Sequence, residues 1–303
     1  MTAKALTLRK RIRRTKGDIL FDSINAIVLT IAMLTVLYPL YFVVIASISE
    51  PNMVNTGRVV LLPVMPSFEG YQRIFENQKI WNGYQNTILY TVAGTAFNMA
   101  LTMTVAYVLS VPRFSLKKPL MAFLMIPVYF SGGLIPSYLL IRSIGIENTR
   151  WALILINGLN VMNAIIARSF IQGAVPRELS EAAEIDGCSH FGIFFRIVLP
   201  LSKAGMAVLV LYYAVAHWNE YMLSLIYLRD SKLYSLQIIL REILLQNQAQ
   251  DFMDDITSVT EKQRAAELIK YGVVVVSSLP MLILYPFLQK YFVKGTLIGS
   301  LKG

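Results

Sequence analysis

The chain has 303 residues, of which 55% are hydrophobic and only 15% are charged, and its mean hydropathy is +0.55. Soluble domains carry about a quarter charged residues, and a membrane-spanning helix needs about 20 apolar residues. Because the apolar residues here come in blocks of about that length, the composition excludes an ordinary soluble domain and indicates a bilayer protein. The net charge of +10 concentrates at the ends of these blocks, which is a topology signal and argues against nucleic-acid binding.

Six apolar segments predict six transmembrane helices, and therefore an all-α, polytopic membrane protein. The segments are 24–48, 86–111, 119–141, 151–172, 204–228 and 269–292. The first follows a basic stretch but is much longer than the apolar region of a signal peptide, so we expect a retained helix. The run Ser131–Gly132–Gly133 predicts a weak point in the third segment.

Basic residues predict the orientation of these segments. The stretches 1–19, 112–118, 173–203 and 290–303 hold 16 Lys and Arg in 71 residues, against 10 in the 86 residues of the opposite loops. Because Lys and Arg accumulate in cytoplasmic loops, we expect a multi-pass protein of the plasma or inner membrane with both termini in the cytoplasm.

The sequence gives little indication of a metal site or a disulfide on this chain. The single cysteine, Cys188, excludes an internal disulfide and a multi-cysteine metal site. Three aspartates of the outer loop 229–268 lie close together, namely Asp251, Asp254 and Asp255. They lack the Gly and Glu spacing of a calcium loop, so a solvated loop is the favoured interpretation and no metal or cofactor is expected on this chain.

The cytoplasmic stretch 173–203 has the pattern of a helix, a glycine and a second helix. Pro176 suits the start of the first helix, and Gly187 permits a sharp reversal. Acidic residues favour the first helix through its dipole, at Glu178, Glu181 and Glu184. Apolar residues recur at helical spacing in the second, at Phe191, Phe194, Phe195 and Val198. Such a face suits the lipid interface or a groove on a partner protein, and the pattern alone does not separate the two.

The order of residues in this loop resembles a known signature. Binding-protein-dependent ABC importer permeases carry Glu-Ala-Ala, three residues, Gly, nine residues and Ile-x-Leu-Pro, and this chain supplies Glu181, Ala182, Ala183, Gly187, Ile197, Leu199 and Pro200 in register. The resemblance implies the type I importer permease fold, with this loop as the coupling helix that docks into an ATP-binding subunit. Asp186 and Phe191 join the implied coupling residues. One departure is Ala204–Gly205, where such permeases often place a proline.

The resemblance covers nearly the whole chain and is to carbohydrate-uptake permeases like the inner subunit of maltose permeases. The C-terminal stretch 285–303 is similar to the branch that handles complex or uronate-containing oligosaccharides. It implies a complex of two permeases, two ATPases that hold Mg-ATP, and an extracytoplasmic solute-binding protein. We expect three parts: 1–80 with the first helix and outer loop, 81–292 as the five-helix core, and 293–303 as a Gly-rich cytoplasmic tail.

The chain itself offers no catalytic motif. It has no Gly-x4-Gly-Lys-Ser/Thr, HExxH or Gly-x-Ser-x-Gly pattern, so a transport subunit is expected rather than an enzyme. A membrane enzyme would need clustered nucleophiles or metal ligands. A channel or secondary carrier would need charged relays or internal repeats. Neither pattern is present, and the importer permease is the favoured interpretation.

Polar residues within the predicted spans are candidates for the substrate path. Glu220 is the one acidic residue well inside a predicted span, next to Trp218 and Asn219. This trio suits a sugar, although a role in helix packing or gating is slightly favoured. Three asparagines recur along the fourth segment at i, i+3 and i+6, namely Asn157, Asn160 and Asn163. They line either a pore or a helix interface, and Asn160 and Asn163 join the substrate-path candidates.

Overall fold

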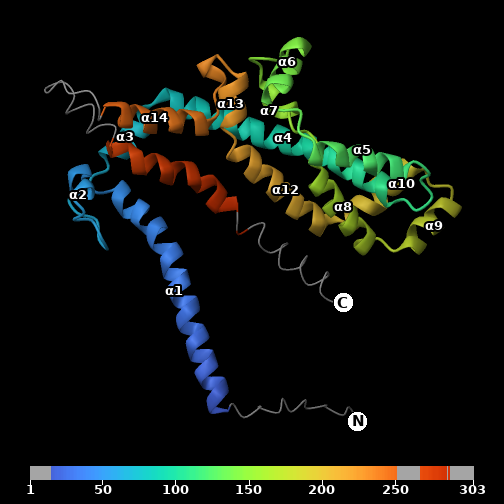
Figure 1. The fold of residues 1–303 in the computed structure, drawn as a ribbon, viewed down its shortest axis with the longest axis horizontal. Helices are drawn as coiled ribbons and strands as arrows, with labels where there is room; N and C mark the ends of the chain where they lie inside the picture. The colour runs from blue at the N-terminus through green and yellow to red at the C-terminus, as the bar shows by residue number, and fades with distance from the viewer. Residues whose placement is uncertain (1–14, 251–266, 285, 287–303) are drawn as a thin grey trace, which may run out of the picture. The chain divides into compact units, whose positions relative to one another are not determined.

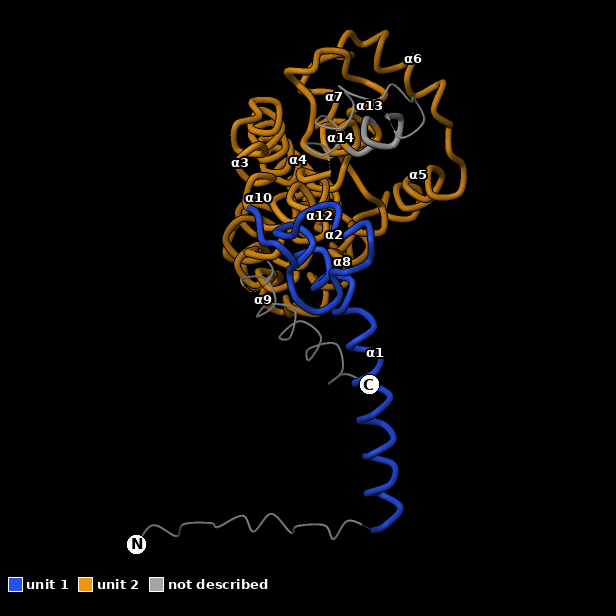
Figure 2. Tube along the Cα trace, turned by 90° about the vertical axis from the view of Figure 1, so that its left-hand side faces the viewer, with its two compact units in different colours: residues 1–67 blue, residues 68–303 orange. Residues whose placement is uncertain are grey.

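The computed structural model describes residues 15–250, 267–284 and 286, and within these ranges the regular elements are all helical (Figure 1). The chain divides into two compact units, residues 1–67 and 68–303, which are coloured separately in Figure 2. The all-α class predicted from the sequence is therefore confirmed for the described part of the chain. The predicted division at residues 80 and 81 stays a prediction, and the predicted tail 293–303 lies outside the described residues.

The first unit is built on one long helix, α1 (Lys16–Ser47), followed by α2 (Pro51–Asn55). The side chain of Thr15 accepts a hydrogen bond from the backbone N–H of Asp18, and the Asp18 carboxylate accepts one from Thr15 in return, so a capping box starts α1. At about 1.5 Å per residue, 32 residues extend about 48 Å, more than the hydrocarbon thickness. The helix begins eight residues before the predicted start at residue 24. The capping box at Thr15 fixes this start, whereas the prediction is based on where the apolar run begins.

The second unit is organised around α4 (Gln78–Ser110), against which α8 (Val161–Ala174) and α12 (Lys203–Trp218) pack (Figure 1). The largest buried cluster lies among these three helices and includes Ala106, Ile171 and Leu209. The other elements are α3 (Glu69–Glu76), α5 (Lys117–Tyr129), α6 (Leu134–Ile144), α7 (Arg150–Leu155), α9 (Arg177–Ile185), α10 (His190–Ile193), η1 (Phe194–Val198), α11 (Leu199–Leu201), α13 (Met222–Tyr227), η2 (Ser231–Leu233), α14 (Leu236–Gln250) and the helix Glu267–Leu284.

The third predicted span is broken where the glycines predicted a weak point. Helix α5 ends at Tyr129, α6 begins at Leu134, and the two helices meet at 115°. Gly133 has a φ of +80°, a conformation that glycine adopts without the steric cost a side chain would bring. The predicted kink at Ser131–Gly133 is confirmed.

Two further predicted spans are not continuous helices. The fourth, 151–172, separates into α7 and α8 with an irregular segment at 156–160. The fifth, 204–228, ends as a helix at Trp218, and α13 begins only at Met222. In the described residues three helices are long and apolar enough to cross a membrane, or up to five if each bent pair forms one span. This supports a multi-pass membrane protein, while the count of six spans stays a prediction.

Candidate functional site

The loop between α8 and α12 folds as the predicted helix, glycine and second helix. Helix α9 begins directly after Pro176, and its chain reverses at Gly187, whose φ is +78°. The Ser189 side chain then accepts a hydrogen bond from the Gly192 N–H at 3.3 Å and caps α10. An added Cβ at Gly187 would meet no atom within 4 Å, so the reversal requires glycine for its backbone conformation and not for lack of space.

Large apolar side chains of this loop are exposed. Ile185 at the end of α9 is 86% exposed, and Phe191 and Phe195 of the second helix are 78% and 60% exposed. Leu179 on α9 is 43% exposed. Exposed apolar groups gathered on one projection are typical of an interaction surface.

The predicted apolar face of the second helix is only partly correct. Of its four members, Val198 is buried and Phe194 is half-buried against the Tyr107 ring, at 5.2 Å between centroids, whereas Phe191 and Phe195 are exposed. The physical reason is a π-helical turn over Phe194–Val198, whose wider i→i+5 turn breaks the 3.6-residue period on which the prediction rested. Ile193, outside the predicted face, is 1% exposed and takes the core position.

The signature residues divide into an outer and an inner set. Glu181, Ala182, Asp186 and Pro200 are exposed. Ala183, Ile197 and Leu199 are partly buried and pack against the core among α4, α8 and α12. The inner set therefore fixes the loop on the helix bundle, while the outer set and the exposed phenylalanines remain accessible in this chain.

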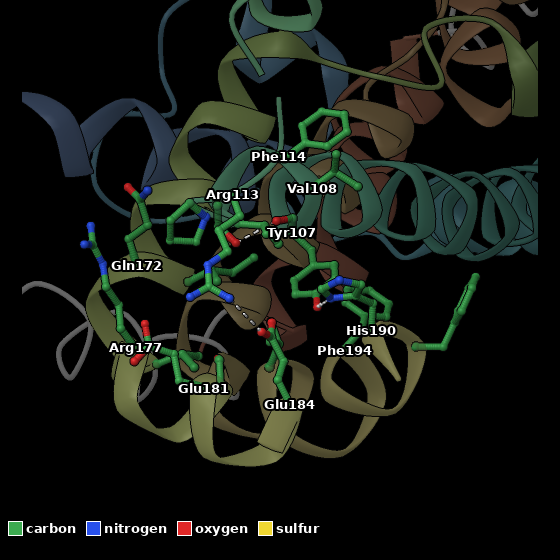
Figure 3. A pocket seen from close by; sticks show the side chains of 18 of the residues that line it. Tyr107, Val108, Arg113, Phe114, Gln172, Arg177, Glu181, Glu184, His190 and Phe194 are labelled. Carbon is green, nitrogen blue, oxygen red and sulfur yellow. Dashed lines mark hydrogen bonds and ion pairs between the residues drawn. The ribbon is translucent and has the colours of Figure 1, made fainter. Parts of the chain in front are cut away.

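A cavity of about 930 Å³ lies between the loop and the helix bundle (Figure 3). Its lining combines the end of α4 and residues 111–115 with α8, α9 and the second helix of the loop. The predicted cytoplasmic stretches 112–118 and 173–203 thus lie together, as a shared side of the membrane requires. Two side-chain contacts cross the cavity: Arg113 Nη1 lies 3.9 Å from Glu184 Oε2, and Tyr107 Oη lies 3.3 Å from His190 Nδ1.

The loop is connected to the bundle through a sharp bend. The helical stretch His190–Leu201 and helix α12 meet at 82°, with Ser202 between them. Gly205 then lies so close to Phe170 on α8 that an added Cβ would be 2.5 Å from the Phe170 Cγ. The departure from the signature at Ala204–Gly205 therefore leaves the helix intact and brings α8 and α12, the two supports of the loop, into close contact.

The predicted trio in the fifth span lies at a helix end and not inside a helix. Trp218 is 3% exposed, and its Nε1–H donates to the Ser277 carbonyl at 3.1 Å. Asn219 is exposed and donates to the Val215 carbonyl at 3.0 Å. Glu220 Oε1 accepts a hydrogen bond from the Leu223 N–H at 2.9 Å and so caps the start of α13. Trp218 therefore links α12 to the helix Glu267–Leu284, whereas the contacts of Asn219 and Glu220 are local.

The asparagine stripe expected along the fourth span is wrong as a helical feature. Asn157 and Asn160 fall in the segment between α7 and α8, so they share no helix face with Asn163. Asn160 Oδ1 accepts a hydrogen bond from the Asn163 N–H at 3.0 Å and caps α8, while Asn157 has a φ of +61°. Both Asn157 and Asn160 are exposed.

Sequence reasoning missed the residue that holds this segment in place. Asn98, near the middle of α4 and 1% exposed, donates from Nδ2 to the carbonyls of Asn157 and Gly158 at 2.9 and 2.7 Å. Its Oδ1 lies 2.6 Å from His217 Nε2 on α12. The signal was present in the sequence, because an asparagine in the middle of an apolar segment requires a polar partner.

Comparison with known proteins places the chain in a family. Residues 100–298 match the family described as "Binding-protein-dependent transport system inner membrane component". The chain belongs to this family. The region matched contains the whole loop 173–203 with its Glu-Ala-Ala and Gly187, together with all of α8 and α12 and the end of α4 from residue 100. This permease is therefore a membrane component of a transport system and not an enzyme.

Relatives of the permease match over nearly their full length. The polygalacturonan/rhamnogalacturonan transport system permease protein YtcP of Bacillus subtilis (strain 168) is 39% identical over 286 residues, 94% of this chain and 99% of its own. Protein LplC of the same organism is 36% identical over 298 residues, 96% and 98%. The galactooligosaccharides transport system permease protein GanQ, also of Bacillus subtilis (strain 168), is 32% identical over 281 residues, 88% and 91%.

A solved structure shares the fold of the permease. It is titled "Crystal structure of a bacterial ABC transporter involved in the import of the acidic polysaccharide alginate". The matching chain has a TM-score of 0.83 and 29% identity, and the match covers 92% of the permease and 99% of that chain. The permease therefore has the fold of an ABC transporter membrane subunit.

Proposed function

We propose that this permease moves sugars or short oligosaccharides into the cytoplasm as part of an ATP-driven importer. The relatives named above are permeases for polygalacturonan or rhamnogalacturonan and for galactooligosaccharides, and the solved structure comes from an importer of alginate. Two of these three polymers carry uronate units, which supports complex or uronate-containing oligosaccharides as the substrate class. Polar groups at the helix breaks, including Asn160, Asn163 and Glu220, are the proposed contacts along the path.

The proposed energy source is a pair of separate ATP-binding subunits that hold Mg-ATP and grip the Glu181–Pro200 loop. One observation supports this most directly: the loop presents Ile185, Phe191 and Phe195 to its surroundings on a reversal that only Gly187 makes easily. A rigid helix pair with an apolar tip fits a groove on a partner protein. The remaining proposed partners are a second, homologous permease and an extracytoplasmic solute-binding protein. Both termini are proposed to face the cytoplasm.

Association with the ATP-binding subunits tests the coupling role. Gly187→Asp adds a side chain where φ is +78°, and Glu181→Lys inverts an exposed signature charge. We expect both variants to reach the membrane and to lose co-purification with the ATPase. Gly173→Ala is the matched control, because Gly173 lies in α8 with no atom within 4 Å of an added Cβ. Retained association and retained transport in both variants would contradict the coupling role.

Uptake by the reconstituted importer tests the substrate class. Proteoliposomes with the cognate binding protein would be given galacturonate, alginate, galactose and glucose oligosaccharides of matched length. We expect ATP-dependent uptake of at least one uronate-containing oligomer, and no uptake when the ATPase subunits are omitted. Uptake of neutral oligomers alone would reject the uronate assignment but leave the importer assignment in place.

A further inference from the structure

Near the middle of α4, far from the loop, polar groups from three parts of the chain are hydrogen-bonded to one another. Asn98 from α4, His217 from α12, and the carbonyls of Asn157 and Gly158 between α7 and α8 are joined by three hydrogen bonds of 2.6 to 2.9 Å. We call these groups the Asn98 bracket. Each amide hydrogen of Asn98 serves one carbonyl, so its Oδ1 must accept, and His217 must carry its proton on Nε2.

The bracket replaces hydrogen bonds that the broken span cannot make. A helix through 156–160 would satisfy its own carbonyls, but this segment is irregular and Asn157 has a φ of +61°. Inside a membrane, irregular backbone is tolerated only where protein groups or a wet cavity satisfy it. Asn98, itself 1% exposed, provides two donors to this segment, and so it fixes the position of the break relative to α4.

The neighbouring packing leaves the bracket little freedom. An added Cβ at Gly94 would lie 2.4 Å from the His217 Cε1, and one at Gly158 would lie 2.6 Å from the Phe97 Cε1. The imidazole is therefore pressed against the backbone of α4, and the break is pressed against the Phe97 ring. Displacing any one of the three elements requires the other two to move or the hydrogen bonds to separate.

Helix α12 connects the bracket to the loop. The helix begins after the 82° bend at Ser202, next to the loop, and His217 occupies its last turn. Its 16 residues extend about 24 Å, with no proline between Lys203 and Trp218. A continuous helix without an internal proline transmits a tilt at one end to the other end.

We infer that the Asn98 bracket carries motion of the loop, through α12 and His217, to the break at 156–160, where the exposed Asn157 and Asn160 are placed. Asn98 and His217 are thus positioning residues for transport. This inference rests on the proposed coupling of the loop to an ATPase. It adds that the break in the fourth span follows the loop because of two specific side chains, and not merely because the helices are packed together.

Pulsed electron-electron spin resonance on the purified complex in nanodiscs tests the inference. With Cys188 replaced by serine, one spin-label pair at Thr104→Cys and Arg196→Cys reports on the loop. A second pair at Trp151→Cys and Ser169→Cys spans the break. All four labelled positions are exposed in this chain. Each pair is measured without nucleotide and after trapping with ATP and vanadate.

The variants separate the bracket from general stability. His217→Phe keeps a ring against Gly94 but removes the donor, and Asn98→Leu removes all three hydrogen bonds with little change in volume. His217→Gln restores a side-chain N–H. Only variants that co-purify with the ATPase at the yield of the unaltered complex are compared. If one of the two bracket variants fails to fold, the other one still tests the inference.

We expect trapping to shift both distance distributions in the unaltered complex. His217→Phe and Asn98→Leu should keep the shift of the loop pair and lose that of the pair across the break, while His217→Gln should keep both. Persistence of the shift across the break in both bracket variants would overturn the inference and leave the coupling proposal intact. A loop pair that does not respond in the unaltered complex would instead refute the coupling proposal, and the inference with it.

Discussion

The close contact between Gly205 and Phe170 predicts a strong difference between two glycine-to-alanine substitutions. At Gly205 the added Cβ would lie 2.5, 2.8 and 2.9 Å from the Cγ, Cβ and Cδ2 of Phe170. Rotation of the ring about the Cβ–Cγ bond can displace Cδ2 but leaves Cβ and Cγ in place, so α8 and α12 must separate. At Gly173, also helical, nothing lies within 4 Å. Both glycines lie in terminal turns, where alanine gains at most about 1 kcal/mol over glycine.

Helix propensity therefore cancels in the comparison, and only the overpacking remains. Overpacking costs about 1–3 kcal/mol, so Gly205→Ala should be less stable than Gly173→Ala by about that amount, or roughly 2–12 °C in melting temperature. Fluorescence-detected size-exclusion chromatography after heating in detergent measures this difference. The double variant Gly205→Ala with Phe170→Ala should recover part of the loss. Equal stability of the two single variants would show that α8 and α12 are not in this contact, and the reasoning would be refuted.

Two further predictions concern other contacts of the permease. Tyr138 donates to Glu147 at 2.6 Å and, together with the nearby Arg229, lowers the carboxyl pKa below its ordinary 4.5. This stabilisation is present above pH 4.5 and is lost as the pH falls through the lower folded pKa, so Glu147→Gln should lower the melting temperature at pH 7 and have a shrinking effect in a titration to pH 3.5. Asn160→Ala removes the cap of α8 at a cost of about 1 kcal/mol, whereas Asn160→Ser should be nearly neutral; equal melting curves for the two would contradict the cap.

Local chemistry explains what the sequence could predict. The loop was predictable because each part of it is coded by neighbouring residues: Pro176 before the helix, Gly187 at a positive φ, and Ser189 as a cap. The break at Ser131–Gly133 was predictable for the same reason. In each case the residue type itself fixes the backbone, whatever it is packed against.

The breaks in the fourth and fifth predicted spans were not predictable from local sequence. Segment 151–172 is largely apolar, and the Asn157–Gly158 pair within it is tolerable in a continuous helix. What stabilises the irregular form is Asn98, about 60 residues earlier in the chain. Similarly, α12 ends at Trp218, where the indole donates to the carbonyl of Ser277, 59 residues later. Hydrophobic periodicity does not record such long-range hydrogen bonds.

The contrast between locally coded structure and long-range hydrogen bonds also explains which elements of the permease are rigid. Helices α4 and α12 each run without an internal break, and they contact each other through close glycine approaches such as Gly94 against His217. The breaks lie at 130–133, 156–160 and 219–221, and each leaves polar backbone that a neighbour must satisfy. An element that is broken but hydrogen-bonded to a rigid one cannot unfold freely, yet it can move as that rigid element moves. A transporter needs this combination, since the path must open and close while the backbone stays satisfied in both states.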